Sequence, residues 1–140
     1  MPSGTQHTWI GCFILFVVNS IIIFTTQTNE VRLLCIFTNI FLFSTFYLSP
    51  DLDINSSVYK RWGLLKIIWL PYKKLFNHRQ RSHGFITGPI SLLLYLGLLL
   101  SPGFYTLYHI NYQFPLTEIL LSVTVIIFSV EAHIVADKLL

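Results

Sequence analysis

The sequence is 140 residues long and contains 54% hydrophobic, 16% aromatic and 11% charged residues, with a formal net charge of +3. Soluble domains contain about 25% charged residues, so this chain has too few to cover a soluble surface. Its apolar content and low net charge also exclude a disordered protein. With a mean hydropathy of +0.65, the composition indicates an integral membrane protein with one domain over residues 1–140.

Four apolar runs predict membrane-spanning helices, because backbone polar groups in lipid must be paired within the helix. The runs cover about residues 9–26, 33–49, 85–100 and 119–136. Pro102 and Gly103 are expected to break any extension of the third run. Residues 1–8 contain no Lys or Arg, so we expect the first run to be a retained helix and not a signal peptide. The fold class predicted is an all-α, four-helix membrane bundle.

The basic residues predict the orientation of these spans. Seven of the nine Lys and Arg residues fall between the second and third runs: Lys60, Arg61, Lys66, Lys73, Lys74, Arg79 and Arg81. Cytoplasmic loops carry such an excess. We therefore expect segment 51–83 and, with four spans, both termini on the cytoplasmic or stromal side.

Segment 51–83 also carries apolar side chains at every third or fourth position, as on one side of a helix: Val58, Trp62, Leu65, Trp69, Tyr72 and Phe76. Pro71 is expected to interrupt this helix. We expect two short interfacial helices, with aromatic rings toward the lipid bilayer and lysines toward anionic lipid head groups. Nucleic-acid binding is the alternative for a basic patch, but the adjoining spans favour the membrane surface.

Seven residues suited to metal binding share one membrane face in this topology: His7, Asp51, Asp53, His78, His83, His133 and Asp137. The remaining histidine, His109, falls on the opposite face. Mixed imidazole and carboxylate groups bind Zn, Mn or Fe ions. The convergence therefore predicts a site for one or two divalent metal ions. The alternative is a set of solvated residues that merely end the helices.

The spacing of these residues along the chain predicts how their side chains are oriented relative to one another. In an extended chain Asp51 and Asp53 face the same way and reach one cation together. On a helix, His78 and His83 point about 140° apart, so they converge only if the backbone bends, which Gly84 allows.

The last span adds His133 and Asp137, which share a helix face because they are four residues apart. Glu131 lies deeper, and an ionisable group inside a span is a functional candidate by default. We predict it as the general base; a pair with an arginine is the alternative. Arg79 and Arg81 are expected to bind an anionic head group.

The order of these motifs resembles a family of small metal-binding membrane proteins of unknown function from cyanobacteria and plastids. The resemblance is carried by residues 1–7, 48–53, 59–72 with its RWG and WLPY strings, 78–84 and 131–137. That family is similar to membrane-bound metal-dependent hydrolases. The resemblance implies metal binding by the His and Asp positions, and hydrolase activity through the broader group. The family usually carries Asp directly after the N-terminal His, where this sequence has Thr8.

These observations predict a metal-dependent hydrolase of a lipid or another ester or phosphoester at the membrane face, in which metal-activated water attacks the substrate. A non-enzymatic membrane protein with a closed, structural metal site is the alternative. An ion transporter is disfavoured, because Asn19, Asn39 and scattered Ser and Thr are the main polar residues within the spans.

Overall fold

A computed structural model describes residues 4–26, 31–76, 83–113 and 115–139, and these residues contain helices and no strand. The helices follow the order α1 (Gly4–Thr26), α2 (Val31–Tyr47), η1 (Pro50–Asp53), α3 (Ser57–Arg61), η2 (Gly63–Trp69), α4 (Leu70–Leu75), α5 (Thr87–His109) and α6 (Leu116–Leu139). The predicted all-α class is confirmed.

Four helical stretches are long and apolar enough to cross a membrane, and they correspond to the four predicted runs: Thr5–Thr25, Val31–Asp53, Thr87–His109 and Leu116–Leu139. All four extend beyond the predicted runs at one end or both, because polar residues next to the runs continue the helix. The length and composition of these four helices agree with an integral membrane protein.

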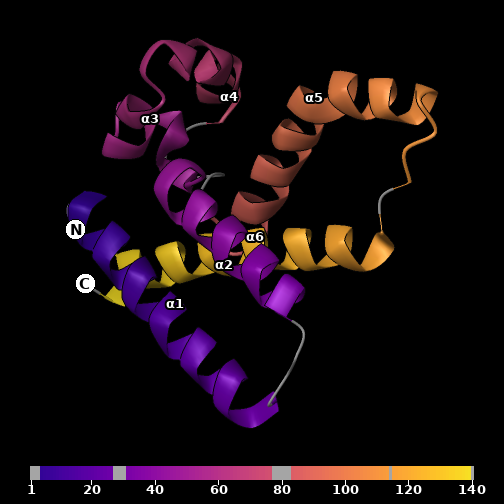
Figure 1. The fold of residues 1–140 in the computed structure, drawn as a ribbon. Coiled ribbons are helices and arrows are strands. Elements are labelled where there is room, and N and C mark those ends of the chain that lie inside the picture. Colours follow the sequence, from indigo (N-terminus) through magenta and orange to yellow (C-terminus); the bar gives the residue numbers. More distant parts are fainter. Residues whose placement is uncertain (1–3, 27–30, 77–82, 114, 140) are drawn as a thin grey trace.

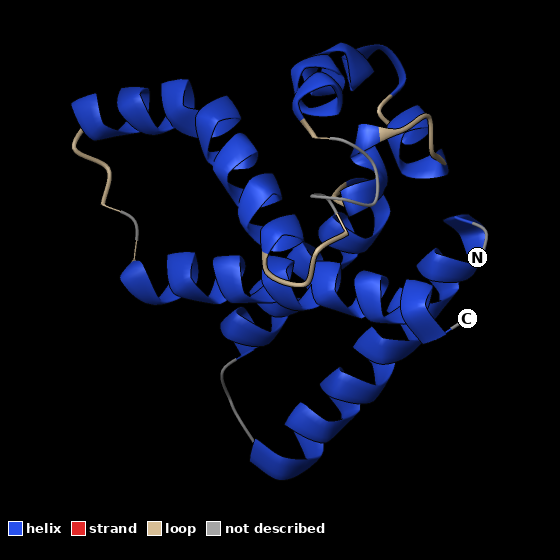
Figure 2. Cartoon of the chain, turned by 180° about the vertical axis from the view of Figure 1, so that it is seen from behind, coloured by secondary structure: helices blue, strands red, loops and turns tan. Residues whose placement is uncertain are grey.

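The third long helix, α5, continues through Pro102, where a break was expected. Proline lacks the N–H that would bond the carbonyl four residues earlier. In α5 the hydroxyl of Ser101 donates to that carbonyl, which belongs to Leu98, at 2.8 Å. Figures 1 and 2 show that α5 bends sharply along its length, as proline-containing helices commonly do. The expected break is wrong, and the chain has a bent helix instead.

The four long helices meet at one end of the molecule and diverge at the other. The amino end of α1 lies close to the carboxyl end of α6, while the far ends of α1 and α5 point in different directions (Figures 1 and 2). Gly11 lets α1 approach α2 closely, because a Cβ atom there would lie 2.4 Å from Cγ2 of Thr45. The Thr45 hydroxyl in turn lies 3.2 Å from that of Ser129 on α6, which joins the three helices.

The segment from α3 to α4 packs onto the protein through its aromatic residues. Trp69 and Tyr72 are fully buried in a core that also includes Tyr95 of α5. The large hydrophobic side chains exposed on this segment are aliphatic, and they include Leu64 and Ile67. The expectation that the aromatic rings face the bilayer is therefore wrong.

Two backbone features explain this outcome. Gly63 adopts a left-handed conformation with φ of 54°, which glycine tolerates without steric cost. Pro71 stands at the beginning of α4, a position that suits proline. The segment is therefore divided into short helices, so it presents no continuous helical face to a bilayer.

Candidate metal centre

The turn after α2 positions the first acidic residue of the site. Ser49 has an extended backbone, and its hydroxyl accepts a hydrogen bond from the Asp51 N–H at 3.2 Å, as N-capping serines do. Pro50 follows at the start of η1, where its missing N–H has no consequence. The sequence Ser49-Pro50 therefore begins the short 3₁₀-helix that carries Asp51.

This helix separates the two aspartates. With about three residues per turn, side chains two positions apart in a 3₁₀-helix point about 120° apart, so Asp51 and Asp53 do not face the same way. The expectation of an extended backbone at this point is wrong. Asp51 belongs to the group described next, whereas Asp53 is buried outside that group.

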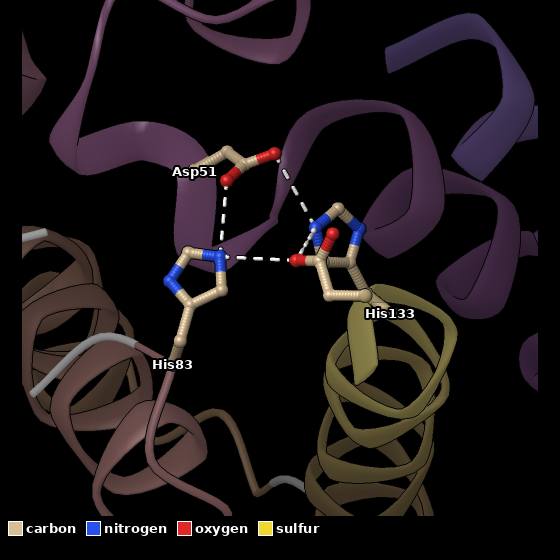
Figure 3. Close-up of side chains that lie close together, drawn as sticks. Asp51, His83 and His133 are labelled. Atoms are coloured by element: carbon tan, nitrogen blue, oxygen red, sulfur yellow. Dashed lines mark ion pairs between the residues drawn. The ribbon is translucent and has the colours of Figure 1, made fainter. Parts of the chain in front are cut away.

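Two imidazoles and two carboxylates converge at the end of the bundle where the long helices meet. Ligand atoms of Asp51, His83, His133 and Asp137 all lie within 4.8 Å of one another; we call these residues the four-residue cluster. The Nε2 atom of His83 lies 3.1 Å from Asp51 Oδ1 and 3.2 Å from Asp137 Oδ2. Figure 3 shows both histidine rings directing nitrogen atoms toward the carboxylates.

The second imidazole repeats this arrangement from the opposite side. Nε2 of His133 lies 3.3 Å from Asp51 Oδ2 and 3.6 Å from Asp137 Oδ2. Each Nε2 therefore faces carboxylates from two different residues, although a single N–H points in one direction only. One cation at the centre would serve all four groups at once.

The separations within the cluster fit a metal ion. Four ligands at about 2.0–2.1 Å from a tetrahedral ion are about 3.3 Å from one another. The nitrogen–oxygen separations of 3.1, 3.2, 3.3 and 3.6 Å are close to this value. Imidazole and carboxylate together suit Zn, Mn or Fe ions. The residues present therefore fit a divalent ion.

His7 supports the cluster from α1. Its Nε2 lies 3.0 Å from Asp137 Oδ1, the oxygen that does not face His83 and His133. Its ring stacks on that of His133 with 4.1 Å between centroids. Such contacts orient a ligand and fix its ring, so the structure places His7 beside the four-residue cluster.

Electrostatics favour a charged imidazole at His83 when no ion is bound. Burial lowers the pKa of His83, but the hydrogen bond and charge of Asp51 and the charge of Asp137 outweigh it and raise that pKa above 6.5. The side chain of His83 is 10% exposed. A metal ion would therefore have to displace a proton from this nitrogen.

The remaining predicted site residues fall elsewhere. Glu131 lies two residues before His133 on α6, so it points to another side of the helix and lines an apolar groove instead of the cluster. Its predicted role as general base has no supporting contact with the cluster among the described residues. His78, Arg79 and Arg81 lie outside the described residues.

Sequence reasoning missed two contributors to this end of the molecule. The hydroxyl of Ser49 lies 3.4 Å from His133 Nε2, and the serine–proline pair was the available signal for its capping position. Arg61 donates to the Phe46 carbonyl at 3.1 Å and to the Thr8 hydroxyl at 3.0 Å. Thr8, where the resembled family carries Asp, therefore contacts a guanidinium group and does not belong to the four-residue cluster.

Comparison with known proteins agrees with a metal site. A family model described as "Uncharacterized metal-binding protein (DUF2227)" matches residues 2–139. An uncharacterized protein of Aquifex aeolicus (strain VF5) is 40% identical over 57 residues, which cover 40% of this chain and 40% of that protein. No solved structure matches the chain. The family description names metal binding and no reaction, so the hydrolase relation and a cyanobacterial or plastid origin stay predictions.

Proposed function

Because the chain belongs to the DUF2227 family of uncharacterized metal-binding proteins, we propose that it is an integral membrane protein with a divalent ion at the four-residue cluster. We further propose that it hydrolyses a lipid or another ester or phosphoester there. The observation that carries this proposal is the convergence of Asp51, His83, His133 and Asp137 within 4.8 Å. Two imidazoles and two carboxylates form a ligand set that suits a divalent ion.

The position of the cluster supports a reaction at the membrane surface. It lies at one end of the helices that could cross a membrane, beside the basic segment. That segment exposes Leu64 and Ile67 on either side of Lys66, a combination that suits a lipid surface with anionic head groups. The excess of basic residues supports a cytoplasmic or stromal location for this end.

The residues of this chain have separable tasks in such a site. A divalent ion, when bound, polarises an ester or phosphoester and activates water at neutral pH. Asp51 and Asp137 supply negative charge, and His83 and His133 supply the nitrogen ligands. His7 holds the outer oxygen of Asp137 at 3.0 Å, which keeps the inner oxygen directed at the centre.

A structural metal site is the second candidate, because the cluster joins separate parts of the chain. Its residues come from η1, from the turn before α5 and from α6. Four protein ligands complete a closed tetrahedral site. In that case the ion stabilises the bundle and leaves no position for a substrate.

Metal content is the first test. We expect the detergent-purified protein to contain stoichiometric Zn, Mn or Fe by mass spectrometry. A His83→Ala variant should lose this metal, whereas His109→Ala, an exposed histidine at the other end of α5, should keep it. Absence of metal from the wild type, even after loading, would contradict both the hydrolase and the structural metal site.

Turnover then separates the two candidates. With metal bound, hydrolysis of nitrophenyl acetate or bis(nitrophenyl) phosphate that is lost in His83→Ala and kept in His109→Ala supports the hydrolase. If no ester or phosphoester is hydrolysed but chelation lowers the melting temperature, the structural site is the correct reading.

A further inference from the structure

The side chain of Arg61, at the end of α3, connects this helix to α1 and α2. Its Nη1 atom donates to the Phe46 carbonyl of α2 at 3.1 Å, and its Nη2 atom donates to the Thr8 hydroxyl of α1 at 3.0 Å. The guanidinium carbon also lies 5.2 Å from the centre of the Phe46 ring. Because the guanidinium group is planar and rigid, these three contacts give it one defined position. The side chain of Lys60, beside it in the sequence, is exposed.

The contact with Phe46 satisfies the carboxyl end of α2. A helical carbonyl accepts from the N–H four residues later, but that residue is Pro50, which has no N–H. The Arg61 guanidinium supplies the missing donor, and its positive charge suits the negative end of the helix dipole. Arg61 therefore stabilises the point where α2 ends and the turn toward Asp51 begins.

The residue after Arg61 completes this arrangement. The carbonyl of Tyr47 also lacks its helical donor, because the Asp51 N–H bonds to the hydroxyl of Ser49. The indole N–H of Trp62 donates to the Tyr47 carbonyl instead, at 2.9 Å. The last two carbonyls of α2 are therefore bonded to consecutive side chains, next to the turn that brings Asp51 to the four-residue cluster.

The contact with Thr8 reaches another part of the metal centre. Thr8 directly follows His7 on α1, and Nε2 of His7 lies 3.0 Å from the outer oxygen of Asp137. A hydrogen bond at Thr8 restricts the rotation of the first turns of α1, and with it the direction of the His7 ring. One guanidinium group therefore connects the turn that carries Asp51 with the helix that carries His7.

We propose that Arg61 is a positioning residue of the metal centre, which aligns α1 with the end of α2 so that His7 and Asp51 meet the rest of the site. Arg61 acts through its hydrogen bonds and does not contact the ion. This inference rests on the metal site of the proposed function, but it requires no particular reaction there. The alternative is that Arg61 stabilises the fold and has no effect on metal binding.

Metal affinity, measured by competition with a chromophoric chelator, tests this role. Thr8→Val keeps the shape of the side chain and removes its hydroxyl. It should lower the affinity about tenfold, the lower end of the range for loss of an orienting partner. Arg61→Gln should lower the affinity further, because the end of α2 is released as well. The double variant should bind no more weakly than Arg61→Gln, since the bond is already absent there, and additive losses would overturn the proposal.

The sign of the effect separates positioning from charge. Loss of a positive charge near a cation site would by itself raise the metal affinity, whereas misplaced ligands lower it. Lys60→Gln removes the neighbouring charge from an exposed position and should not lower the affinity. An affinity that rises or stays constant in Arg61→Gln would contradict the positioning role.

A hydrogen bond between the same two helices provides a matched control. Asn19 of α1 donates to the Thr38 hydroxyl of α2 at 3.0 Å, about three turns further along α1 than His7. Thr38→Val should leave the metal affinity unchanged, and Thr8→Ser should keep it because the hydroxyl is retained. If Thr8→Val lowered only the melting temperature of the metal-free protein and not the affinity, Arg61 would be a purely structural residue. These Thr8 variants decide the question even if Arg61→Gln does not fold.

Failure of this role can be distinguished from failure of the proposed function. Metal binding by the wild type with no loss in Thr8→Val or Arg61→Gln would overturn the positioning role and keep the metal site. The expected losses of affinity without hydrolysis of any ester or phosphoester would keep the positioning role and remove the hydrolase. A wild type that binds no metal would overturn both the metal site and the role of Arg61.

Discussion

The two ends of the helical bundle treat their polar residues in opposite ways. At the cluster end, side chains from α1, η1, α6 and the turn before α5 meet, and those of His7, His83 and Asp137 are at most 11% exposed. At the far end, Arg32 pairs with Glu118 on the surface, and the Arg32 side chain is 73% exposed. Burial of polar groups is costly unless they are paired, so the buried set points to function and the exposed pair does not.

The largest effect is expected from a change of one aspartate in the cluster. Asp51→Asn should reduce bound metal to background, because the amide removes a charged ligand that faces both histidines. Asp53→Asn should retain metal, because the 3₁₀-helix turns Asp53 away from the cluster. Metal analysis of the two purified variants checks this, and loss of metal in Asp53→Asn alone would contradict the assignment.

The next effect concerns the histidine that supports the cluster. His7→Ala should weaken metal binding by about 10- to 100-fold, as loss of an orienting partner of a ligand does. Competition with a chromophoric chelator measures this affinity. His109→Ala, at the far end, is the control that should leave it unchanged. If His7→Ala and His109→Ala lowered metal affinity equally, His7 would have no special role beside the four-residue cluster.

Acidification should release the metal from the cluster end. The pKa of His83 is raised above 6.5 without metal, so below that pKa a proton has to leave before the nitrogen binds an ion. Affinity should fall about tenfold per pH unit for each proton displaced. In the metal-free protein this histidine contributes stability that is present below pH 6.5 and lost as the pH rises through its raised pKa.

Two measurements between pH 5 and 9 check these predictions. Metal affinity should rise with pH, whereas the melting temperature of the metal-free protein should fall as the pH passes the raised pKa of His83. An affinity that does not change with pH would contradict imidazole ligation.

A smaller effect is expected where α1 approaches α2. Gly11→Ala should destabilise the protein by about 1–3 kcal/mol, because an added Cβ would meet Thr45 and force the helices apart. Gly97→Ala is the control, since no atom lies within 4 Å of a Cβ there, and it should be neutral or slightly stabilising. Thermal unfolding in detergent compares them, and equal stability would show that the close approach is unimportant.

The smallest effect is expected at the far end. Arg32→Ala removes the exposed ion pair with Glu118 and should change the free energy of unfolding by at most about 1 kcal/mol. Metal content should not change. A loss of metal in this variant would mean that the two ends are coupled.

Much of this comparison could be predicted from the sequence. Apolar runs, the first three of them without charges, located the four long helices. An even number of spans brings residues from the start, middle and end of the chain to one face. His7, Asp51, His83, His133 and Asp137 meet there in the structure. The i, i+4 spacing of His133 and Asp137 was sufficient to place both on one side of α6.

Other features depend on tertiary structure. Spacing could not choose between Asp51 and Asp53, because the choice depends on whether the chain is extended or forms a 3₁₀-helix after Pro50. The direction of Trp69 and Tyr72 was missed because a period of three to four residues identifies a face but not the surface that it covers. The continuation of α5 through Pro102 depends on Ser101, whose hydroxyl replaces the missing donor.

The spread of the cluster along the chain has a consequence for biosynthesis. Ser49 and His133 are 84 residues apart, and α6 follows the other helices of the described residues. While α6 is still being translated, a nascent chain has Asp51 and His83 but neither of their partners on α6. Binding of a metal ion by all four residues would therefore be a late step of assembly, after α6 has docked. A chelator added during cell-free translation should leave chain synthesis unaffected and arrest maturation at this step.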